Sequence, residues 1–366
     1  MTAATTIFSH RDDAAAASVD ALRAAYPQVR GHLDAATCGL PLLGTVVAMQ
    51  RALQEWQDGA ACAVRYGETV ERARGLAARV LGVPTSWVAT GSQTSVAVGT
   101  VAAGLPDGAR VVVVEDDFTS VTYPFTQHAD RGIEVVAVPL EGLADAVARG
   151  CDAVAFSLVA SRTGHLADVD AVLEAAHDVG ALTLADLTQA AGWLPVTAER
   201  FDVTVTSGYK WLSCPRGTAV TTVAPAARDH LRATSAGWYA SESPWDGVYG
   251  TTPRLAPDAR RFDVSPAWLA WVGAVPALEA YAAVDLAGVR DHDVALANAF
   301  RAGVDLPPGE SAIISLPDPD GAARARLEAA GCRVAGRGGG VRLAFHVWSD
   351  AEDVELALAS LGTGVI

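Results

Sequence analysis

Basic residues are scarce in this chain: 27 lysines and arginines stand against 42 aspartates and glutamates, giving a formal net charge of −15. An acidic surface repels the phosphates of nucleic acids and the head groups of anionic lipids. We therefore expect no nucleic-acid partner and no membrane-surface partner. The few basic residues are mostly arginine, which draws attention to the lysine in TSGYKWLSCPRG at 206–217, between two large aromatic residues.

Cysteines are also few, and they occur singly at positions 38, 62, 151, 214 and 332. Because there is no CxxC pair and the number of thiols is odd, we expect neither a disulfide framework nor a metal site. The stretch MTAATTIFSHRDD has acidic residues where a secretion signal needs basic charge and then an apolar run. No segment approaches the apolar run of about 18 residues that crosses a membrane. These absences predict a cytoplasmic protein with free thiols.

Apolar residues make up 51% of the 366 residues and charged residues 19%, which is typical of a globular protein with a large core. Short apolar runs alternate with helical patterns. The predicted strands are 111–114, 134–138, 152–156, 181–185 and 202–206, and the predicted helices include 13–25, 44–57, 67–81 and 167–180. Continuous apolar strands indicate a sheet covered on both faces, and the alternation predicts an α/β fold with a mostly parallel sheet.

The pattern changes near residue 250. Ser265 and Pro266 predict the N-cap and the first position of a long apolar helix. The remaining residues form a compact α+β pattern, with the strands AIISL, CRVAG and VRLAF separated by helices and turns. We therefore predict an N-terminal segment (1–25), a large α/β domain that binds the ligand (26–255) and a small C-terminal α+β domain (256–366).

The segment GSQTS at 91–95 is the first candidate for ligand binding, because ligands of open α/β sheets bind beyond the carboxyl ends of the strands. It follows one strand and opens a helix. Backbone N–H groups at a helix start, together with the side chains of Ser92, Gln93 and Thr94, suit a phosphate group. The alternative is that Ser92 simply caps the helix.

Two further candidates follow the next strands along the chain. Phe118 lies just past a strand end, where its ring either stacks on a flat ligand or belongs to the core. Ser161 lies with Thr163 and Gly164 in a polar loop that either lines a pocket or caps the next helix.

Asp186 and Lys210 follow two successive strands, so we expect them on opposite sides of one small ligand. A carboxylate at the end of a buried strand is costly unless a cation pairs with it, although helix capping is an alternative role for Asp186. A lysine in a desolvated pocket loses its proton readily and becomes an amine nucleophile. A lysine, a carboxylate, a phosphate site and a stacking ring are together what pyridoxal 5'-phosphate needs.

The sequence resembles the class V aminotransferase family of fold-type I pyridoxal-phosphate enzymes. The resemblance depends on Asp186-x-x-Gln189, on Ser207-Gly208-Tyr209-Lys210-Trp211 and on Pro215-Arg216-Gly217. It extends from Leu33–Pro41, similar to the family's N-terminal strand, to Gly338–Val354, similar to its carboxylate-binding segment. Relatives include cysteine desulfurases, isopenicillin N epimerase-like proteins, kynureninase and the ergothioneine-pathway C–S lyase.

The resemblance implies a role for each matching residue. Lys210 forms the Schiff base with the cofactor and moves the Cα proton, Asp186 pairs with the pyridinium nitrogen, and Arg342 binds the substrate carboxylate, where a surface arginine is the alternative. The remaining implied cofactor contacts are the phosphate ligands Ser92, Gln93, Ser207 and Tyr209, the ring-stacking Phe118, and Gln189 and Ser161 near the ring hydroxyl.

The resemblance also implies a homodimer acting on an amino-acid substrate, with the segment 245–253 reaching the partner's site. Transamination is the leading reaction, with C–S β-elimination or epimerisation as alternatives. Desulfurases need a mobile cysteine, and the one candidate, Cys332, opens an apolar strand and is expected to be buried. A nicotinamide-dependent oxidoreductase is a remote alternative, because no G-x-G-x-x-G follows the first strand. A catalytically silent binding protein is another.

Overall fold

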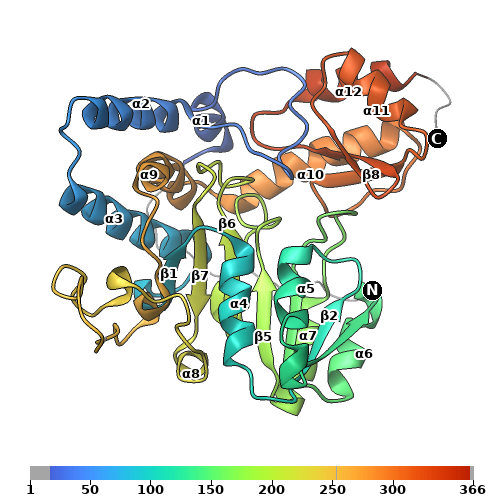
Figure 1. Cartoon of the computed structure of the whole chain (residues 1–366). Helices are drawn as coiled ribbons and strands as arrows, with labels where there is room; N and C mark the ends of the chain where they lie inside the picture. Colours follow the sequence, from blue (N-terminus) through green and yellow to red (C-terminus); the bar gives the residue numbers. More distant parts are fainter. Residues whose placement is uncertain (1–16, 253, 363–366) are drawn as a thin grey trace.

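A seven-stranded mixed sheet forms the centre of the computed structural model, which describes residues 17–252 and 254–362. The strand order is β1-β7-β6-β5-β4-β2-β3, and the five strands from β6 to β3 run parallel, while β7 runs antiparallel to β6 and to β1 (Figure 1). The strands are β1 (Val88–Gly91), β2 (Arg110–Val114), β3 (Glu134–Val138), β4 (Ala153–Ser157), β5 (Leu182–Asp186), β6 (Val203–Ser207) and β7 (Ala219–Val223). The predicted α/β fold with a mostly parallel sheet is therefore confirmed.

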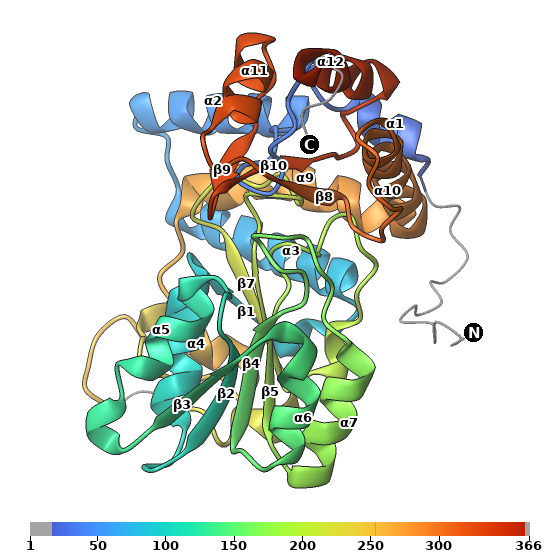
Figure 2. The same ribbon diagram turned by 90° about the vertical axis from the view of Figure 1, so that its right-hand side faces the viewer.

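Helices cover both faces of this sheet, with α4 and α5 on one side and α6 and α7 on the other (Figure 2). Strand β2 shows why: Val111 and Val113 belong to one apolar core, and Val112 and Val114 belong to the other. The helices of this part are α2 (Leu43–Gln57), α3 (Ala63–Leu81), α4 (Thr94–Gly104), α5 (Thr119–Thr126), α6 (Leu143–Ala148), α7 (Val169–Val179), α8 (Pro225–Arg228) and α9 (Trp268–Ala283). The continuous apolar strands therefore match a sheet buried on both faces.

The predicted ends of α2 and α3 are confirmed, whereas α3 begins four residues before the predicted 67 and α7 begins two residues after the predicted 167. Helix α7 ends at Gly180, which adopts a left-handed conformation with φ of 71°, as the predicted helix 167–180 requires. The predicted start of α9 is wrong, because the helix begins at Trp268 with Ala267 as its N-cap. Ser265 does not cap it, since its hydroxyl accepts a hydrogen bond from the indole of Trp238. Residues 13–16 of the first predicted helix lie outside the described residues, and α1 spans Val19–Ala24.

The C-terminal residues form a separate three-stranded antiparallel sheet in the order β8-β10-β9. Its strands are β8 (Ile313–Pro317), β9 (Ala335–Arg337) and β10 (Gly340–Ala344), and its helices are α10 (Leu286–Gly303), α11 (Ala322–Ala329) and α12 (Ala351–Leu361). The predicted strand at 332–336 begins later, at Ala335, so that Cys332 precedes it. The segment 33–41, expected to resemble a strand, makes only an isolated bridge between Asp34 and Ala344.

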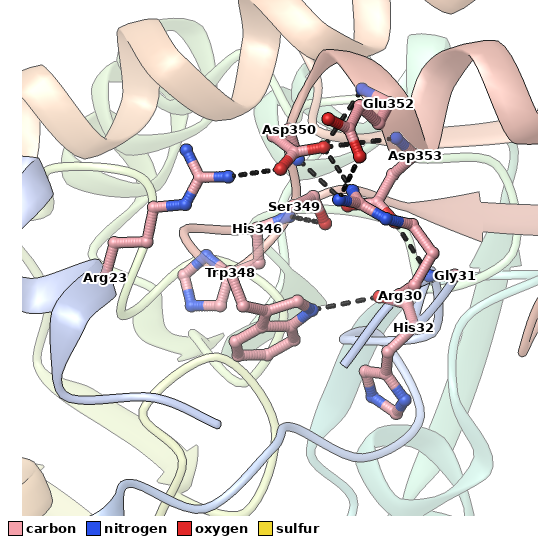
Figure 3. Close-up of polar contacts among 10 residues, drawn as sticks. All are labelled: Arg23, Arg30, Gly31, His32, His346, Trp348, Ser349, Asp350, Glu352 and Asp353. Atoms are coloured by element: carbon pink, nitrogen blue, oxygen red, sulfur yellow. Dashed lines mark hydrogen bonds and ion pairs between the residues drawn. The ribbon is translucent and has the colours of Figure 1, made fainter. Parts of the chain in front are cut away.

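Residues 23–32 lie against this C-terminal unit (Figure 3). Arg23 donates to the carboxylate of Asp350 at 2.7 Å, and Arg30 pairs with the same carboxylate (Figure 3). The indole of Trp348 donates to the backbone carbonyl of His32 at 2.9 Å. These contacts bring together residues that are more than 300 positions apart in the sequence. None of the helices in the described ranges is long and apolar enough to cross a membrane.

Candidate active site

Lys210 lies just beyond the carboxyl end of β6 and is the only lysine of the chain. Its side chain is 6% exposed, and its amine makes no hydrogen bond or ion pair with any described residue. Burial is the main reason that the pKa of Lys210 falls from 10.5 to about 8. Asp186 opposes this fall, while Arg342 adds to it. The chain therefore holds a single buried amine that is partly uncharged near neutral pH.

The loop that carries Lys210 is fixed by close backbone contacts. The carbonyl of Tyr209 accepts a hydrogen bond from the amide of Gly39 at 3.0 Å, and a Cβ on Gly39 would lie 2.0 Å from the Lys210 carbonyl oxygen. Only glycine fits there. Ser213 adopts a φ of 54°, which is unusual for a residue with a side chain, and its amide donates to the Lys210 carbonyl at 3.1 Å. Cys214 is buried in the same turn, as expected of a structural thiol.

Asp186 ends β5, the parallel neighbour of β6, and is 4% exposed. Burial raises its pKa to about 6, while hydrogen bonds from Thr188 and the charge of Lys210 act in the opposite direction. Its carboxylate accepts the Thr188 amide at 2.8 Å. Residues 187–193 form turns, not a helix, so the helix-capping alternative is wrong. The carboxylate lies where the two successive strands were expected to place it.

The ring of Phe118 lies next to the lysine, with its centroid 5.5 Å from Nζ. The side chain is 44% exposed, so the alternative of a core aromatic residue is wrong. Phe118 precedes α5, and the neighbouring Asp117 carboxylate accepts the backbone amides of Phe118 and Ser157 at 2.6 Å each. These bonds fix the start of α5 to the end of β4. The ring is therefore held beside the amine and open on one face.

Hydroxyl and amide groups gather between the start of α4 and the end of β6. Helix α4 begins at Thr94 with Gln93 as its N-cap, and no side chain caps it, so capping by Ser92 is wrong. The hydroxyls of Thr94 and Ser207 lie 2.9 Å apart, and the Ser207 amide donates to the hydroxyl of Thr188 at 2.9 Å. Free N–H groups at a helix start and adjacent hydroxyls are suitable ligands for a phosphate.

Tyr209 and Arg216 extend this group of donors. The guanidinium carbon of Arg216 lies 4.9 Å from the centroid of the half-buried Tyr209 ring. Burial raises the pKa of the Tyr209 hydroxyl, which stays protonated at neutral pH. Sequence reasoning missed Arg216 and Thr188 as parts of this site. Both lie within the motifs that drew attention to Lys210 and Asp186, so their position was the available signal.

Gln189 joins three parts of the chain through its side-chain amide. The amide nitrogen donates to the Ala36 carbonyl at 3.0 Å and to the Ser161 hydroxyl at 3.1 Å, and the amide oxygen accepts the Trp211 indole N–H at 2.8 Å. Both N–H groups of Gln189 are thus used within the protein. A ring hydroxyl at this point would have to replace one of these bonds or share it.

Arg342 is buried at 1% exposure in β10, so the surface-arginine alternative is wrong. One terminal nitrogen donates to the Ser161 carbonyl at 2.6 Å, and the other donates to the Thr37 hydroxyl at 2.7 Å and lies 3.5 Å from the Asp34 carboxylate. Its Nε has no partner among the described residues. Burial lowers the pKa of Arg342 to about 10. An under-satisfied guanidinium near the lysine is suited to an anionic ligand.

Cys332, the expected counterpart of a desulfurase cysteine, does not lie at this site, whereas the exposed Cys38 directly precedes Gly39, whose amide donates to the Tyr209 carbonyl. Cys332 is 4% exposed, as predicted, and packs in the core of the C-terminal unit, where burial raises the pKa of its thiol. Within the described ranges, no group of three or more histidine, cysteine or acidic side chains is arranged to hold a metal ion.

Known proteins resemble this chain in sequence and in fold. A family model described as "Aminotransferase class-V" matches residues 57–323. The chain is 27% identical over 284 residues to "Uncharacterized aminotransferase YcbU" from Bacillus subtilis, covering 74% of this chain and 75% of that protein. It is 28% identical over 260 residues to a kynureninase from Deinococcus radiodurans, covering 68% of this chain and 62% of that protein. Its fold is similar to a solved structure of the cystine C–S lyase C-DES, with a TM-score of 0.82, 17% identity and coverage of 91% and 97%.

Proposed function

This chain belongs to the class-V aminotransferase family, and on that premise we propose that it acts at the Cα of an amino-acid substrate, with transamination as the leading reaction. Enzymes of this family use pyridoxal 5'-phosphate, which is therefore the cofactor of this chain. The observation that carries the proposal is the environment of Lys210. The only lysine of the chain is buried, has a pKa of about 8, and lies beside Asp186 at the edge of the sheet.

The residues of the site fit the cofactor. The Lys210 amine has no partner among the described residues, which leaves it available for a covalent bond. Asp186 would hold the ring nitrogen, Phe118 would cover one ring face, and Gln189 with Ser161 would lie near the ring hydroxyl. The phosphate would be held by the group of donors formed by Ser92, Gln93, Ser207 and Tyr209. The structure adds Thr94 and Thr188, which orient Ser207.

The chemistry of the site follows from this arrangement. When bound, pyridoxal phosphate accepts the electron pair that remains on Cα when its proton is removed. Lys210 removes that proton with its Nζ, because a pKa of about 8 leaves part of the amine uncharged near neutral pH. Arg342 binds the substrate carboxylate and thereby directs the Cα–H bond toward the lysine. The buried Trp211 and the ring of Phe118 exclude water from the amine.

Elimination of a C–S bond is the second candidate reaction, because it begins with the same removal of the Cα proton. The burial of Cys332 favours elimination over desulfuration that passes through a persulfide on this cysteine. Persulfide transfer needs a reactive thiol, a role for which the buried Cys332 is poorly suited, whereas release of a thiol product by elimination needs no protein cysteine. Epimerisation also starts from the same proton transfer and differs only in the face to which the proton returns.

A panel of amino acids and cysteine S-conjugates separates these reactions. Exchange of the Cα proton with deuterium oxide, followed by NMR, tests the step that all three share. Transamination requires an added 2-oxoacid acceptor and converts it to a new amino acid, whereas elimination releases pyruvate, ammonia and a thiol without an acceptor. Failure of every substrate to exchange its Cα proton, in protein loaded with the cofactor, contradicts the proposed function.

We further propose a cytoplasmic homodimer with its active site at the interface. The support is a group of exposed apolar side chains on and beside α2, namely Leu43, Val47, Leu53, Trp56 and Val64. Tyr249, in the segment 245–253 that we expect to reach the partner, is 95% exposed, although residue 253 lies outside the described residues. Sedimentation equilibrium tests the dimer. Val47→Glu with Trp56→Glu is expected to give monomers with reduced activity, since exposed apolar patches of this kind mark interfaces.

A further inference from the structure

A fully buried chain of polar side chains runs beneath the loop that carries Lys210. His346, Asp293 and Tyr281 are each 0% exposed, and Tyr26 and Ser213 are each 2% exposed. The Nδ1 atom of His346 lies 2.6 Å from the Asp293 carboxylate, and its Nε2 lies 2.8 Å from the Tyr281 hydroxyl and 2.9 Å from the Trp211 carbonyl oxygen. No step of the proposed reaction uses these groups.

The chain continues from Tyr281 to the other side of the same loop. The Tyr281 hydroxyl lies 2.8 Å from that of Tyr26, which lies 2.7 Å from the hydroxyl of Ser213. Trp211 and Ser213 flank the turn just after Lys210, and Ser213 has a φ of 54°. The loop is thus held at two points by one hydrogen-bonded chain, which begins in the C-terminal unit and includes the N-terminal segment.

The acceptors among these hydrogen-bonded groups determine where their protons lie. A backbone carbonyl only accepts, so the contact between His346 Nε2 and the Trp211 carbonyl is a hydrogen bond only if Nε2 carries a proton. The short contact to Asp293 needs a second proton between Nδ1 and the carboxylate. The Asp293–His346 pair therefore holds two protons. Tyr281 can then donate to Tyr26, and Tyr26 to Ser213.

We propose that His346, oriented by Asp293, is a positioning residue that fixes Lys210 by donating a hydrogen bond to the Trp211 carbonyl. The edge of the Trp211 ring lies against the imidazole, with centroids 5.0 Å apart, and its indole N–H is bonded to Gln189. Trp211 is thereby held by its backbone and by its side chain, and Lys210 precedes it directly. The inference rests on the proposed role of Lys210, and its test separates the two.

The test measures how fast the full chain, freed of cofactor, combines with added pyridoxal phosphate. The readouts are the visible absorbance and, after borohydride reduction, the mass added to Lys210. Because Lys210 is the only lysine, mass added to a lysine side chain measures the reaction of Lys210 alone. His346→Phe keeps a ring but loses both N–H groups, and it is expected to slow the reaction roughly tenfold or more. His346→Gln retains a donor and is expected to react within about threefold of the wild type.

Phe300→Leu is the matched control, because Phe300 is a fully buried core residue of the same C-terminal unit without a contact to the loop. It is expected to lower the thermal midpoint and to leave the rate of combination unchanged. A His346→Phe rate equal to that of the wild type, or no slower than that of Phe300→Leu, overturns the inference. If His346→Phe does not fold, His346→Leu takes its place with the same expectation, since its side chain also lacks a hydrogen-bond donor. A wild-type chain that never gains mass on Lys210 contradicts the proposed function instead.

Discussion

Asp186 and Lys210 lie at the carboxyl ends of the adjacent parallel strands β5 and β6, and each shifts the pKa of the other toward the charged form. Burial acts more strongly on both and in the opposite direction, raising the pKa of Asp186 to about 6 and lowering that of Lys210 to about 8. Near pH 7 the Asp186 carboxylate is therefore mostly ionised, and a minor fraction of the Lys210 amine is uncharged. The proposed role of Asp186 in holding a ring nitrogen needs the ionised carboxylate. The proposed role of Lys210 in moving a proton needs the uncharged amine.

The first prediction concerns the covalent role of Lys210. Lys210→Ala is expected to abolish the visible absorbance band of the protein with pyridoxal phosphate, and the mass that borohydride fixes to the chain. The reason is that no other lysine is present to replace it. Arg324→Ala, which removes an exposed ion pair with Glu328 in α11, is the control and should retain both signals. A variant at position 210 that still gains the cofactor mass contradicts the assignment.

The second prediction concerns the pH dependence of stability in the chain freed of cofactor. The pKa of Lys210 is about 8 in the folded chain, below its ordinary value of 10.5. Between these values the unfolded chain binds more protons, so the free energy of unfolding contributed by Lys210 rises with pH across this window. Below pH 8 the buried charge costs roughly 3 kcal/mol relative to an uncharged side chain.

Comparison with Lys210→Met isolates this contribution, because tyrosines and cysteines that titrate in the same window remain in both proteins. Urea denaturation at several values of pH gives the free energy of unfolding of each. We expect the methionine variant to be the more stable at pH 7 and the difference to narrow as the pH rises above 8. A difference that stays constant from pH 7 to pH 10 would show that the lysine is not desolvated.

The third prediction concerns Arg342, whose positive charge lowers the pKa of Lys210. Arg342→Gln is expected to raise the pH midpoint at which the Lys210 amine reacts with an acylating reagent, measured by mass spectrometry on the chain freed of cofactor. With a substrate, the same variant should raise KM by about tenfold or more, because a bidentate contact to the carboxylate is lost. Arg337→Gln is the matched control. Arg337 also lowers the pKa of Lys210, but by less than Arg342 does. Arg337→Gln should therefore move the pH midpoint of the Lys210 reaction by less than Arg342→Gln.

The sequence was sufficient to predict that Asp186 and Lys210 lie at the ends of two successive strands. Asp186 and Lys210 each follow an apolar strand of five residues, and parallel neighbours bring such positions to one edge. Helix α7 could be predicted because its amphipathic pattern ends at Gly180. These features depend on residues close together in the sequence, where hydrophobic period and turn residues decide the structure.

The environment of Arg342 and the role of Ser265 could not be predicted in this way. Arg342 is held by Thr37 and Ser161, which are 305 and 181 positions away, and nothing local marks a strand arginine as buried. Ser265 had the residue type and the following proline of an N-cap, yet a bond from Trp238 engages its hydroxyl. His346 was not singled out for the same reason, since its partners come from three separate elements. Long-range packing decided each case.

The last prediction concerns the stability of the strand that leads to the phosphate donors. Arg74 in α3 is 1% exposed and Asp263 is 0% exposed, and their closest atoms, Nη2 and Oδ2, lie 2.6 Å apart. Arg74 also donates to the Val88 carbonyl at 2.7 Å, and Asp263 accepts the Thr90 amide at 2.7 Å. The pair therefore fixes both ends of β1, directly before Gly91 and the start of α4.

Arg74→Met leaves the Asp263 carboxylate buried without a cation and is expected to lower the free energy of unfolding by about 3–5 kcal/mol. Asp263→Leu is expected to lower it by less, because Arg74 keeps its ion pair with Glu71 at 2.9 Å. The double variant should lose much less than the sum, because neither charge remains. Arg51→Ala, which removes an exposed pair with Glu55, should change it by less than about 1 kcal/mol. Denaturant unfolding measures all four proteins. Additive losses in the double variant would mean that the two residues stabilise β1 separately, through Val88 and Thr90, and not as a pair.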